Sequence, residues 1–413
     1  MRIFSGAAAL RQMQKLETRG SALSAYEPRV RTIVERVRQK GDRALRDYAQ
    51  KWDGLGAGEP LQVSKAKLEA AWAMADPRLR SSLRQAAANI RQFCRWQRPR
   101  DWNRNRAGIS LGQVVRPIDS VGCYVPGGRY PLVSTLLMTV IPAQVAGVKN
   151  IRVACPDAKN EVLAAAQMLG VREVYRVGGA QAVAALAYGT ESIRRVDKIV
   201  GPGNIYVTLA KKLVSFDCAI DFLAGPTETV ILSSHGRADF IAADLLAQAE
   251  HDPASIPVFV TTSKRLARRV ASLVKQSARL NSIARRAVAR NGAVLLATSR
   301  DEAIEWTNRI APEHVTVEAD DVPLIHSAGS IFIGDYSAQA AGDYASGPNH
   351  VLPTGGVARF RGGLSVHDFV KVITVQQLTK AGLNRIAPTV AFLAETEGLR
   401  AHADSIRVRC PRA

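Results

Sequence analysis

The chain repeats one short pattern from residue 114 onward, and this pattern limits the possible folds more than any other feature of the sequence. An apolar run typical of a buried strand is usually followed by a stretch with helical periodicity. A first series consists of VGCYVPGG, IRVACP, VREVYRVGG and VDKIVGPG, and a second of ETVILSS, IPVFVTT, GAVLLATS, HVTVE and SIFIG. Strands that alternate with helices form parallel, doubly wound sheets. The sequence therefore predicts an α/β fold with two such domains, which suits a length of 413 residues.

Helical patterns flank these two series. Within residues 26–54, apolar side chains recur on one helical face, at Val30, Ile33, Val34 and Val37. The rest of the first ~110 residues has the same character. From about residue 365 the pattern is again helical. We therefore expect a helical N-terminal segment and a helical C-terminal tail around the two α/β domains.

Three predicted strands of the first series end in glycines, as Gly127-Gly128, Gly178-Gly179 and Gly201-Pro202-Gly203. Glycine at the carboxyl edge of a parallel sheet lets a ligand approach the backbone, and the helix ends at that edge favour anions. Neither G-x-G-x-x-G nor G-x-x-x-x-G-K-[ST] occurs in the sequence. A nucleotide bound at this edge must therefore be held without either fingerprint.

Composition predicts a soluble cytoplasmic protein. Hydrophobic residues make up 47% of the chain, which is typical of a packed globular protein. No apolar run is long enough to span a membrane, and the first residues lack the apolar core of a signal peptide. The five cysteines are scattered and form no C-x-x-C, which favours free thiols over disulfides or a cysteine-rich zinc site; they are Cys94, Cys123, Cys155, Cys218 and Cys410.

The chain is strongly basic, with 56 basic and 36 acidic residues and a formal charge of +20. Residues 91–106 and 263–290 are the densest basic stretches. Such an excess raises the possibility of nucleic-acid binding, and Trp96 and Trp102 could stack on bases. The favoured interpretation is a solvated helical face in each stretch, with the two tryptophans half-buried. An acidic ligand such as a dinucleotide would also benefit from the positive field.

Several polar residues have spacings that suit metal binding or proton transfer. Gln248 and His251 form a Q-x-x-H on one helical face, although a histidine at a helix end is also common without a metal. Glu313 and His314 are adjacent and could divide acid and base work, although an exposed charged turn has the same sequence.

A long loop of small residues carries further candidates. Asp343 and His350 lie in it with Asn349 between them, and loops of this kind often carry function. Glu397 and His402 lie in the tail, five residues apart, and could meet one ligand if the helix breaks at Gly398. No G-x-S-x-G is present, so serine-based hydrolysis is not supported.

Seven motifs in order resemble those of the histidinol dehydrogenase family: GPGNIYVTLAKKLV, IDFLAGPTE, DLLAQAEHDP, APEHV, GDYASGPNHVLPTGG, GLSVHDF and LRAH. The resemblance covers about 114–402. It implies an aldehyde-dehydrogenase-like pair of Rossmann-like domains that oxidise L-histidinol through L-histidinaldehyde to L-histidine. It also implies reduction of two NAD, one Zn²⁺ per subunit, and a homodimer of intertwined subunits whose tails reach the partner's site.

The resemblance assigns roles to residues of this chain at the matching motif positions. The implied zinc ligands are Gln248, His251, Asp343 and His402. The implied acid–base pair is Glu313 and His314, with His314 taking the alcohol proton and Glu313 activating water.

Substrate and cofactor contacts follow from the same motifs. The substrate contacts are Thr227, Gln248, His251, His314, Asp343, His350, Glu397 and His402, with Glu397 facing the amine. The NAD contacts are Tyr124, Gln181 and Asn204.

The expected domain boundaries combine the strand pattern with the resemblance. A helical segment spans 1–17. A first α/β domain, built from 18–123 and 229–364, carries the metal and catalytic residues. A second, 124–228, binds NAD, and the tail spans 365–413.

Two alternatives remain at this point. The first is a paralogous zinc- and NAD-dependent dehydrogenase of another polyol, such as a sulfonated diol. An acidic residue at position 397 disfavours an anionic substrate of that kind. The second is a nucleic-acid binder, which only the charge supports. We expect neither specific nucleic-acid binding nor membrane association.

Overall fold

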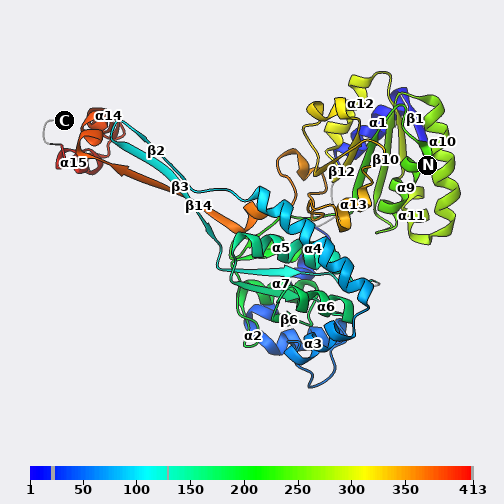
Figure 1. Cartoon of the computed structure of the whole chain (residues 1–413), viewed down its shortest axis with the longest axis horizontal. Coiled ribbons are helices and arrows are strands. Elements are labelled where there is room, and N and C mark those ends of the chain that lie inside the picture. The colour runs from blue at the N-terminus through cyan, green and yellow to red at the C-terminus, as the bar shows by residue number, and fades with distance from the viewer. Residues whose placement is uncertain (20–23, 128–129, 411–413) are drawn as a thin grey trace.

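The computed structural model describes residues 1–19, 24–127 and 130–410. Figure 1 shows two α/β lobes and a long arm that projects away from both of them. The N-terminus lies in one lobe, and the C-terminus lies beyond the tip of the arm. We name the lobes by their sheets, as the five-stranded lobe and the six-stranded lobe.

The five-stranded lobe contains a parallel sheet in the order β6-β5-β4-β7-β8. The chain starts at the central strand, moves outward on one side, and then returns to build the other side, as in a doubly wound fold. The strands are β4 (Ser120–Tyr124), β5 (Asn150–Ala154), β6 (Glu173–Tyr175), β7 (Lys198–Val200) and β8 (Ala219–Ile220). The connecting helices are α5 (Val133–Ala146), α6 (Asn160–Met168), α7 (Gly179–Tyr188) and α8 (Ile205–Val214).

The six-stranded lobe repeats this topology, with the order β1-β11-β10-β9-β12-β13 and all strands parallel. Its strands are β1 (Arg2–Ser5), β9 (Glu228–Leu232), β10 (Ile256–Thr261), β11 (Ala293–Leu296), β12 (His314–Val317) and β13 (Ser330–Ile333). Its helices are α1 (Gly6–Glu17), α9 (Ala238–Ala249), α10 (Lys264–Ser277), α11 (Ser282–Asn291), α12 (Arg300–Ile310) and α13 (Gln339–Tyr344). Short 3₁₀ turns are η1 (Ala278–Leu280), η2 (Ala319–Leu324), η3 (Val357–Arg359) and η4 (Val366–Phe369).

These two sheets confirm the predicted pair of doubly wound, Rossmann-like domains. Every residue of β4 and β9 is buried, because helices cover both faces of a parallel sheet. The basic helix α10 buries Val270 and Val274 and leaves its arginines at the surface, as its periodicity predicts.

The expected domain boundaries are wrong for residues 27–97. These residues form α2 (Glu27–Trp52), α3 (Lys65–Met74) and α4 (Pro77–Gln97), and they pack on the five-stranded lobe rather than on the six-stranded one. Val37 and Leu45, for example, share a hydrophobic core with Leu186. An apolar stripe shows that a helix face is buried, but it carries no information about which sheet buries it.

The two ends of the chain are not purely helical, contrary to the sequence analysis. Residues Arg2–Ser5 form β1, which pairs with β11 at the edge of the six-stranded sheet. The tail begins with the nine-residue strand β14 (Val370–Leu378), and only then forms α14 (Lys380–Thr396) and α15 (Arg400–Arg407). Residues 411–413 of the expected tail lie outside the described residues.

The arm is an antiparallel sheet in the order β14-β3-β2, with α14 and α15 at its tip (Figure 1). It joins β14 to two strands inserted before β4, namely β2 (Trp102–Arg106) and β3 (Ile109–Pro117). The tryptophans expected to be half-buried in a helix are exposed instead, Trp96 to 74% on α4 and Trp102 to 47% on β2. Strand β2 has the sequence WNRNR, and its mostly polar, exposed residues lack the apolar pattern that indicates a strand.

All five cysteines are buried free thiols in the described chain, as expected. Burial raises the pKa of Cys94 to about 11 and that of Cys123 to about 12, which keeps both protonated near neutral pH. Among the described residues, no helix combines the length and hydrophobicity needed to cross a membrane.

Candidate active site between the lobes

Glu313 and His314 lie at the amino end of β12, and Glu313 comes two residues after the left-handed Ala311 that caps α12. His314 is in register with Thr229 on the neighbouring central strand β9. Both side chains are buried, with Glu313 exposed to 7% and His314 to 3%. The alternative of an exposed charged turn is therefore wrong, because the pair is inserted between the ends of buried strands.

The His314 imidazole lies between two carboxylates. Its Nε2 is 3.4 Å from Asp343 Oδ1, and its Nδ1 is 3.8 Å from Glu313 Oε2. The ring stacks on Phe332, with 5.9 Å between ring centroids. Nδ1 is buried and has no hydrogen-bond partner among the described residues. A buried polar atom without a partner is costly, so this nitrogen is available for a ligand or a proton.

Asp343 connects His314 to other predicted site residues. Its Oδ2 accepts a hydrogen bond of 3.0 Å from Nε2 of Gln248, which is 95 positions away in the sequence. Its backbone oxygen lies 2.7 Å from His350 Nδ1. Burial alone would raise the pKa of Asp343, but hydrogen bonding to His314 and the charge of that ring hold it below its usual value.

The loop that carries His350 spans the two lobes. Asn349 donates a hydrogen bond of 2.6 Å to the Met138 oxygen of α5, and His350 Nε2 lies 3.4 Å from Thr135 Oγ1 on the same helix. Burial lowers the pKa of His350. The loop therefore places the candidate site at the boundary between the six-stranded and five-stranded lobes.

A second buried carboxylate, which the sequence analysis missed, supports Glu313 from behind. The Glu228 backbone nitrogen donates a hydrogen bond of 3.1 Å to Glu313 Oε2. The Glu228 carboxylate is gripped by the Arg19 guanidinium through both oxygens, and it also accepts a hydrogen bond of 2.9 Å from Gly355 N. Arg19 follows the first helix and lies 209 positions from Glu228, so no local pattern could have linked them.

Burial raises the pKa of Glu313 from its usual 4.5 to about 8. A carboxyl group with a raised pKa stabilises the fold while it is protonated, and this contribution is lost as the pH rises through the folded-state value.

We therefore expect Glu313→Gln to raise the free energy of unfolding by about 2–4 kcal/mol near pH 9 in metal-free protein. The gain should vanish below about pH 4.5, where the carboxyl is protonated in both states. Urea unfolding of the variant and the parent at several pH values measures this difference. Glu69→Gln, at a half-exposed carboxylate, is the control and should show no such gain. Equal free energies of unfolding for Glu313→Gln and the parent near pH 9 would contradict a raised pKa for Glu313.

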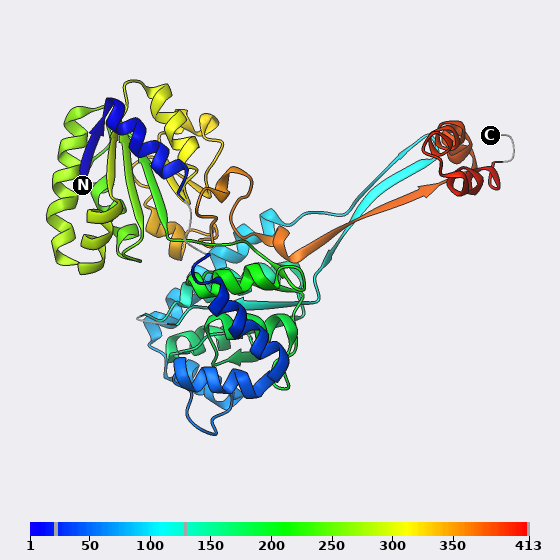
Figure 2. The same ribbon diagram turned by 180° about the vertical axis from the view of Figure 1, so that it is seen from behind.

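Three further predicted site residues are exposed in the single chain rather than buried with this group. His251 is exposed just after α9, three positions beyond the buried Gln248. Glu397 and His402 are exposed at the tip of the arm, far from the six-stranded lobe (Figure 2). Within the described ranges, no three His, Cys, Asp or Glu side chains are arranged to hold a metal ion.

Thr227 is half-buried in the loop that leads into β9. Its backbone oxygen accepts a hydrogen bond of 2.9 Å from Ile256 N. It is adjacent to Glu228, which contacts Glu313, so it lies beside the candidate acid–base pair.

The residues expected to contact NAD lie together at the carboxyl edge of the five-stranded sheet. Tyr124 ends β4, and its hydroxyl accepts a hydrogen bond of 3.0 Å from Gly179 N at the start of α7. Gln181 donates a hydrogen bond of 3.1 Å to Asp53, a contact that the sequence did not reveal. Asn204 caps α8 by accepting from Tyr206 N at 3.0 Å. The edge between β4 and β7 is where the strand order reverses, which is the usual ligand site of such sheets.

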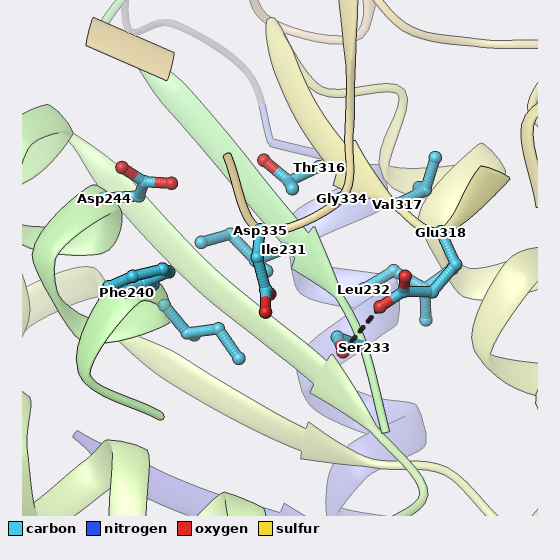
Figure 3. A pocket seen from close by; sticks show the side chains of 11 residues that line it. Ile231, Leu232, Ser233, Phe240, Asp244, Thr316, Val317, Glu318, Gly334 and Asp335 are labelled. Carbon is cyan, nitrogen blue, oxygen red and sulfur yellow. Dashed lines mark hydrogen bonds between the residues drawn. The ribbon is translucent and has the colours of Figure 1, made fainter. Parts of the chain in front are cut away.

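The equivalent edge of the six-stranded sheet holds a small acidic hollow (Figure 3). Asp244, Glu318 and Asp335 line it beside Phe240, near the carboxyl ends of β9 and β12. Burial raises the pKa of Asp244 to about 6. Glu313 and His314 lie at the opposite, amino end of β12, so this hollow is separate from the candidate site.

Comparison with known proteins defines the class. The histidinol dehydrogenase family model matches residues 16–410. Histidinol dehydrogenase of Methanothermobacter thermautotrophicus is 49% identical over 394 residues, covering 92% of each chain. That of Haloarcula marismortui is 48% identical and covers 95% of each. The solved structure of histidinol dehydrogenase from Elizabethkingia anophelis has a TM-score of 0.93 at 36% identity, covering 100% of this chain and 98% of that one. The chain belongs to the histidinol dehydrogenase family.

Proposed function

We propose that this protein oxidises L-histidinol through L-histidinaldehyde to L-histidine and reduces two NAD, in the last steps of histidine biosynthesis in the cytoplasm. The main support is the convergence of the buried Glu313–His314 pair with Gln248 and Asp343 in a member of this family. These residues come from separate parts of the chain and meet at the boundary between the two lobes.

The donor set fits one Zn²⁺ per subunit. Gln248, His251 and Asp343 come from one six-stranded lobe, and His402 would come from the arm of a second chain. Amide oxygen, imidazole and carboxylate are suitable zinc donors, and Gln248 and Asp343 are already within hydrogen-bonding distance of each other. When bound, zinc acts as a Lewis acid that orients the alcohol, and NAD accepts the hydride.

His314 is suited to take the alcohol proton. Its Nε2 faces Asp343, which leaves the unpartnered Nδ1 as the position that accepts a proton. Asp343 stabilises the protonated ring, because a carboxylate beside an imidazole favours the charged form. Burial of the ring excludes water that would otherwise compete for the proton.

Glu313 is suited to activate water for the second oxidation. Its Oε2 lies 3.8 Å from His314 and is oriented by Glu228 N. A carboxyl whose pKa lies near neutral pH can both accept and return a proton. The Arg19–Glu228 pair fixes the backbone nitrogen that orients Glu313, so the carboxyl group is held in one position from which it can activate water.

The substrate is enclosed by residues that differ in charge. His350 and Thr227 flank the acid–base pair from the same chain, and Glu397 of a second chain would face the cationic amine of L-histidinol. The NAD site extends over Tyr124, Gln181 and Asn204 at the carboxyl edge of the neighbouring lobe. This arrangement needs a homodimer, because the arm of each chain extends away from its own site.

A stoichiometry assay tests this function. We expect two NADH for each L-histidinol consumed, loss of activity on treatment with a chelator, and recovery when Zn²⁺ is added. Absorbance at the NADH band measures the NADH formed, and chromatography measures the L-histidinol consumed and the product released. Release of aldehyde after one NADH would contradict the proposal.

The alternative substrate, another polyol, is tested in the same assay. Glu397 supports a cationic substrate, so L-histidinol should give a far higher kcat/KM than an uncharged or sulfonated diol. Charge reversal with Glu397→Lys should depress kcat/KM for L-histidinol and leave NAD binding unchanged.

A further inference from the structure

The loop after β7 approaches the end of β4 more closely than a side chain would allow. Gly201 has a φ of 115°, and a Cβ at this position would lie 2.2 Å from the Tyr124 backbone oxygen. The loop continues to Asn204, the cap of α8. Residues Gly201 to Asn204 therefore form one wall of the site where the proposed function places NAD.

Both polar groups of Gly201 are held by one buried ion pair. Gly201 N donates a hydrogen bond of 2.8 Å to Asp221 Oδ2, and Lys211 Nζ donates one of 3.0 Å to Gly201 O. Lys211 and Asp221 also pair directly with each other. Lys211 is 2% exposed and Asp221 is 4% exposed.

Stability alone does not account for such a pair. The cost of removing two charges from water offsets most of their attraction, and apolar residues of similar size are often as stabilising. What apolar residues cannot supply is an acceptor for the backbone N–H of Gly201 together with a donor for its backbone C=O. We therefore infer that the ion pair serves to hold the backbone of Gly201 rather than to stabilise the hydrophobic core.

The ion pair is also connected to the base of the arm. Arg361 donates a hydrogen bond of 2.6 Å to the Asp221 backbone oxygen, and its guanidinium lies 5.0 Å from the centre of the Phe222 ring. Arg361 also pairs with Asp368, two residues before β14 begins. Arg361 therefore fixes the backbone position of Asp221 independently of the Gly201 loop. Asp221 can in turn hold Gly201 in one position.

We propose that Lys211 and Asp221 are positioning residues for the cofactor: they hold the backbone N–H and C=O of Gly201 and so set the shape of the loop that receives NAD. This inference rests on the proposed function, because it assumes that NAD binds at this edge. Neither side chain touches the cofactor directly, since both are buried beneath the loop.

The test uses the full-length protein with both charges removed together, as Lys211→Met/Asp221→Leu. We expect the Kd for NADH and the KM for NAD to rise roughly tenfold or more, since each lost bond involves a charged group. The KM for L-histidinol should stay within about twofold, because the substrate contacts lie in the other lobe and the arm. NADH fluorescence titration and steady-state kinetics measure these values.

The matched control is Arg152→Met/Glu173→Leu. These substitutions remove another ion pair of the same sheet, in which Arg152 Nε lies 2.8 Å from Glu173 Oε2. Arg152 is buried, and the pair does not contact Gly201. It should lower the thermal midpoint without weakening NADH binding. Equal weakening in the control, or unchanged NADH binding in the Lys211/Asp221 variant, would overturn the proposal.

Asp221→Asn decides the question if the double variant fails to fold. It keeps the shape of the side chain and removes its charge, and weaker NADH binding is again expected. A parent protein that neither binds NADH nor oxidises L-histidinol would refute the proposed function itself. A parent that does both, with a variant that binds NADH equally well, would refute only the positioning role.

Discussion

His314→Asn should lower kcat/KM for L-histidinol by about a thousandfold, which is the size of effect typical of a lost general base. Asparagine can preserve a hydrogen bond to Asp343 but cannot take the alcohol proton. The unpartnered Nδ1 is the atom whose loss matters, because in this structure it is the position open to a proton. Initial rates of NADH formation, with the thermal midpoint as a check on folding, measure the effect.

The matched control for this experiment is His326→Asn. His326 is exposed on the same lobe and lies outside the candidate site. Its substitution should leave kcat/KM within about twofold, as for most surface changes. A His314→Asn variant that keeps more than a tenth of the parental kcat/KM would show that this imidazole is not the base.

Mixing two inactive variants should restore activity if the arm completes the site of a second chain. Asp343→Ala and His402→Ala are each expected to be inactive. When they are unfolded and refolded together in equal amounts, half of the dimers should be mixed and each mixed dimer should hold one intact site. About a quarter of the parental activity is therefore expected from random pairing. Specific activity of the refolded mixture measures the recovery.

The control mixture combines Asp343→Ala with Gln248→Ala. These residues contact each other in one lobe, so every site in a mixed dimer is damaged and no activity should return. Recovery in this control, or its absence from the Asp343/His402 mixture, would contradict a site shared between subunits. Full activity of the His402→Ala variant alone would show that His402 on the arm is not part of the active site.

The central strands of both sheets were predictable because they are buried on both faces, whereas the largely exposed edge strand β1 was not. The runs TVIL in β9 and VGCY in β4 are continuous in apolar or small residues, and each is bounded by turn residues. Glu313 and His314 could likewise be predicted to act together, because they are adjacent in the sequence. Their burial was not, because it depends on β12 lying beside β9 in a sheet that is assembled from distant segments.

Other features could not be read from the sequence for physical reasons. The arm has few core contacts, so its strand β2 lacks the apolar pattern on which strand prediction depends. Arg19 and Asp53 each form hydrogen bonds to partners more than a hundred residues away in the sequence. Their roles follow from tertiary structure alone, whereas Gln248 and His251 are only three positions apart in the sequence.

The way the chain passes between the lobes constrains how the protein can fold during synthesis. Strand β1 is made first, yet its partner β11 starts almost three hundred residues later, so β1 has no partner strand until β11 emerges. All five strands of the other sheet lie between these two points and can pair earlier. Contacts between distant parts of a chain form slowly. Until β11 is made, strand β1 and the edge of β10 that pairs with β11 remain unpaired, so they are the parts of the nascent chain most exposed to aggregation.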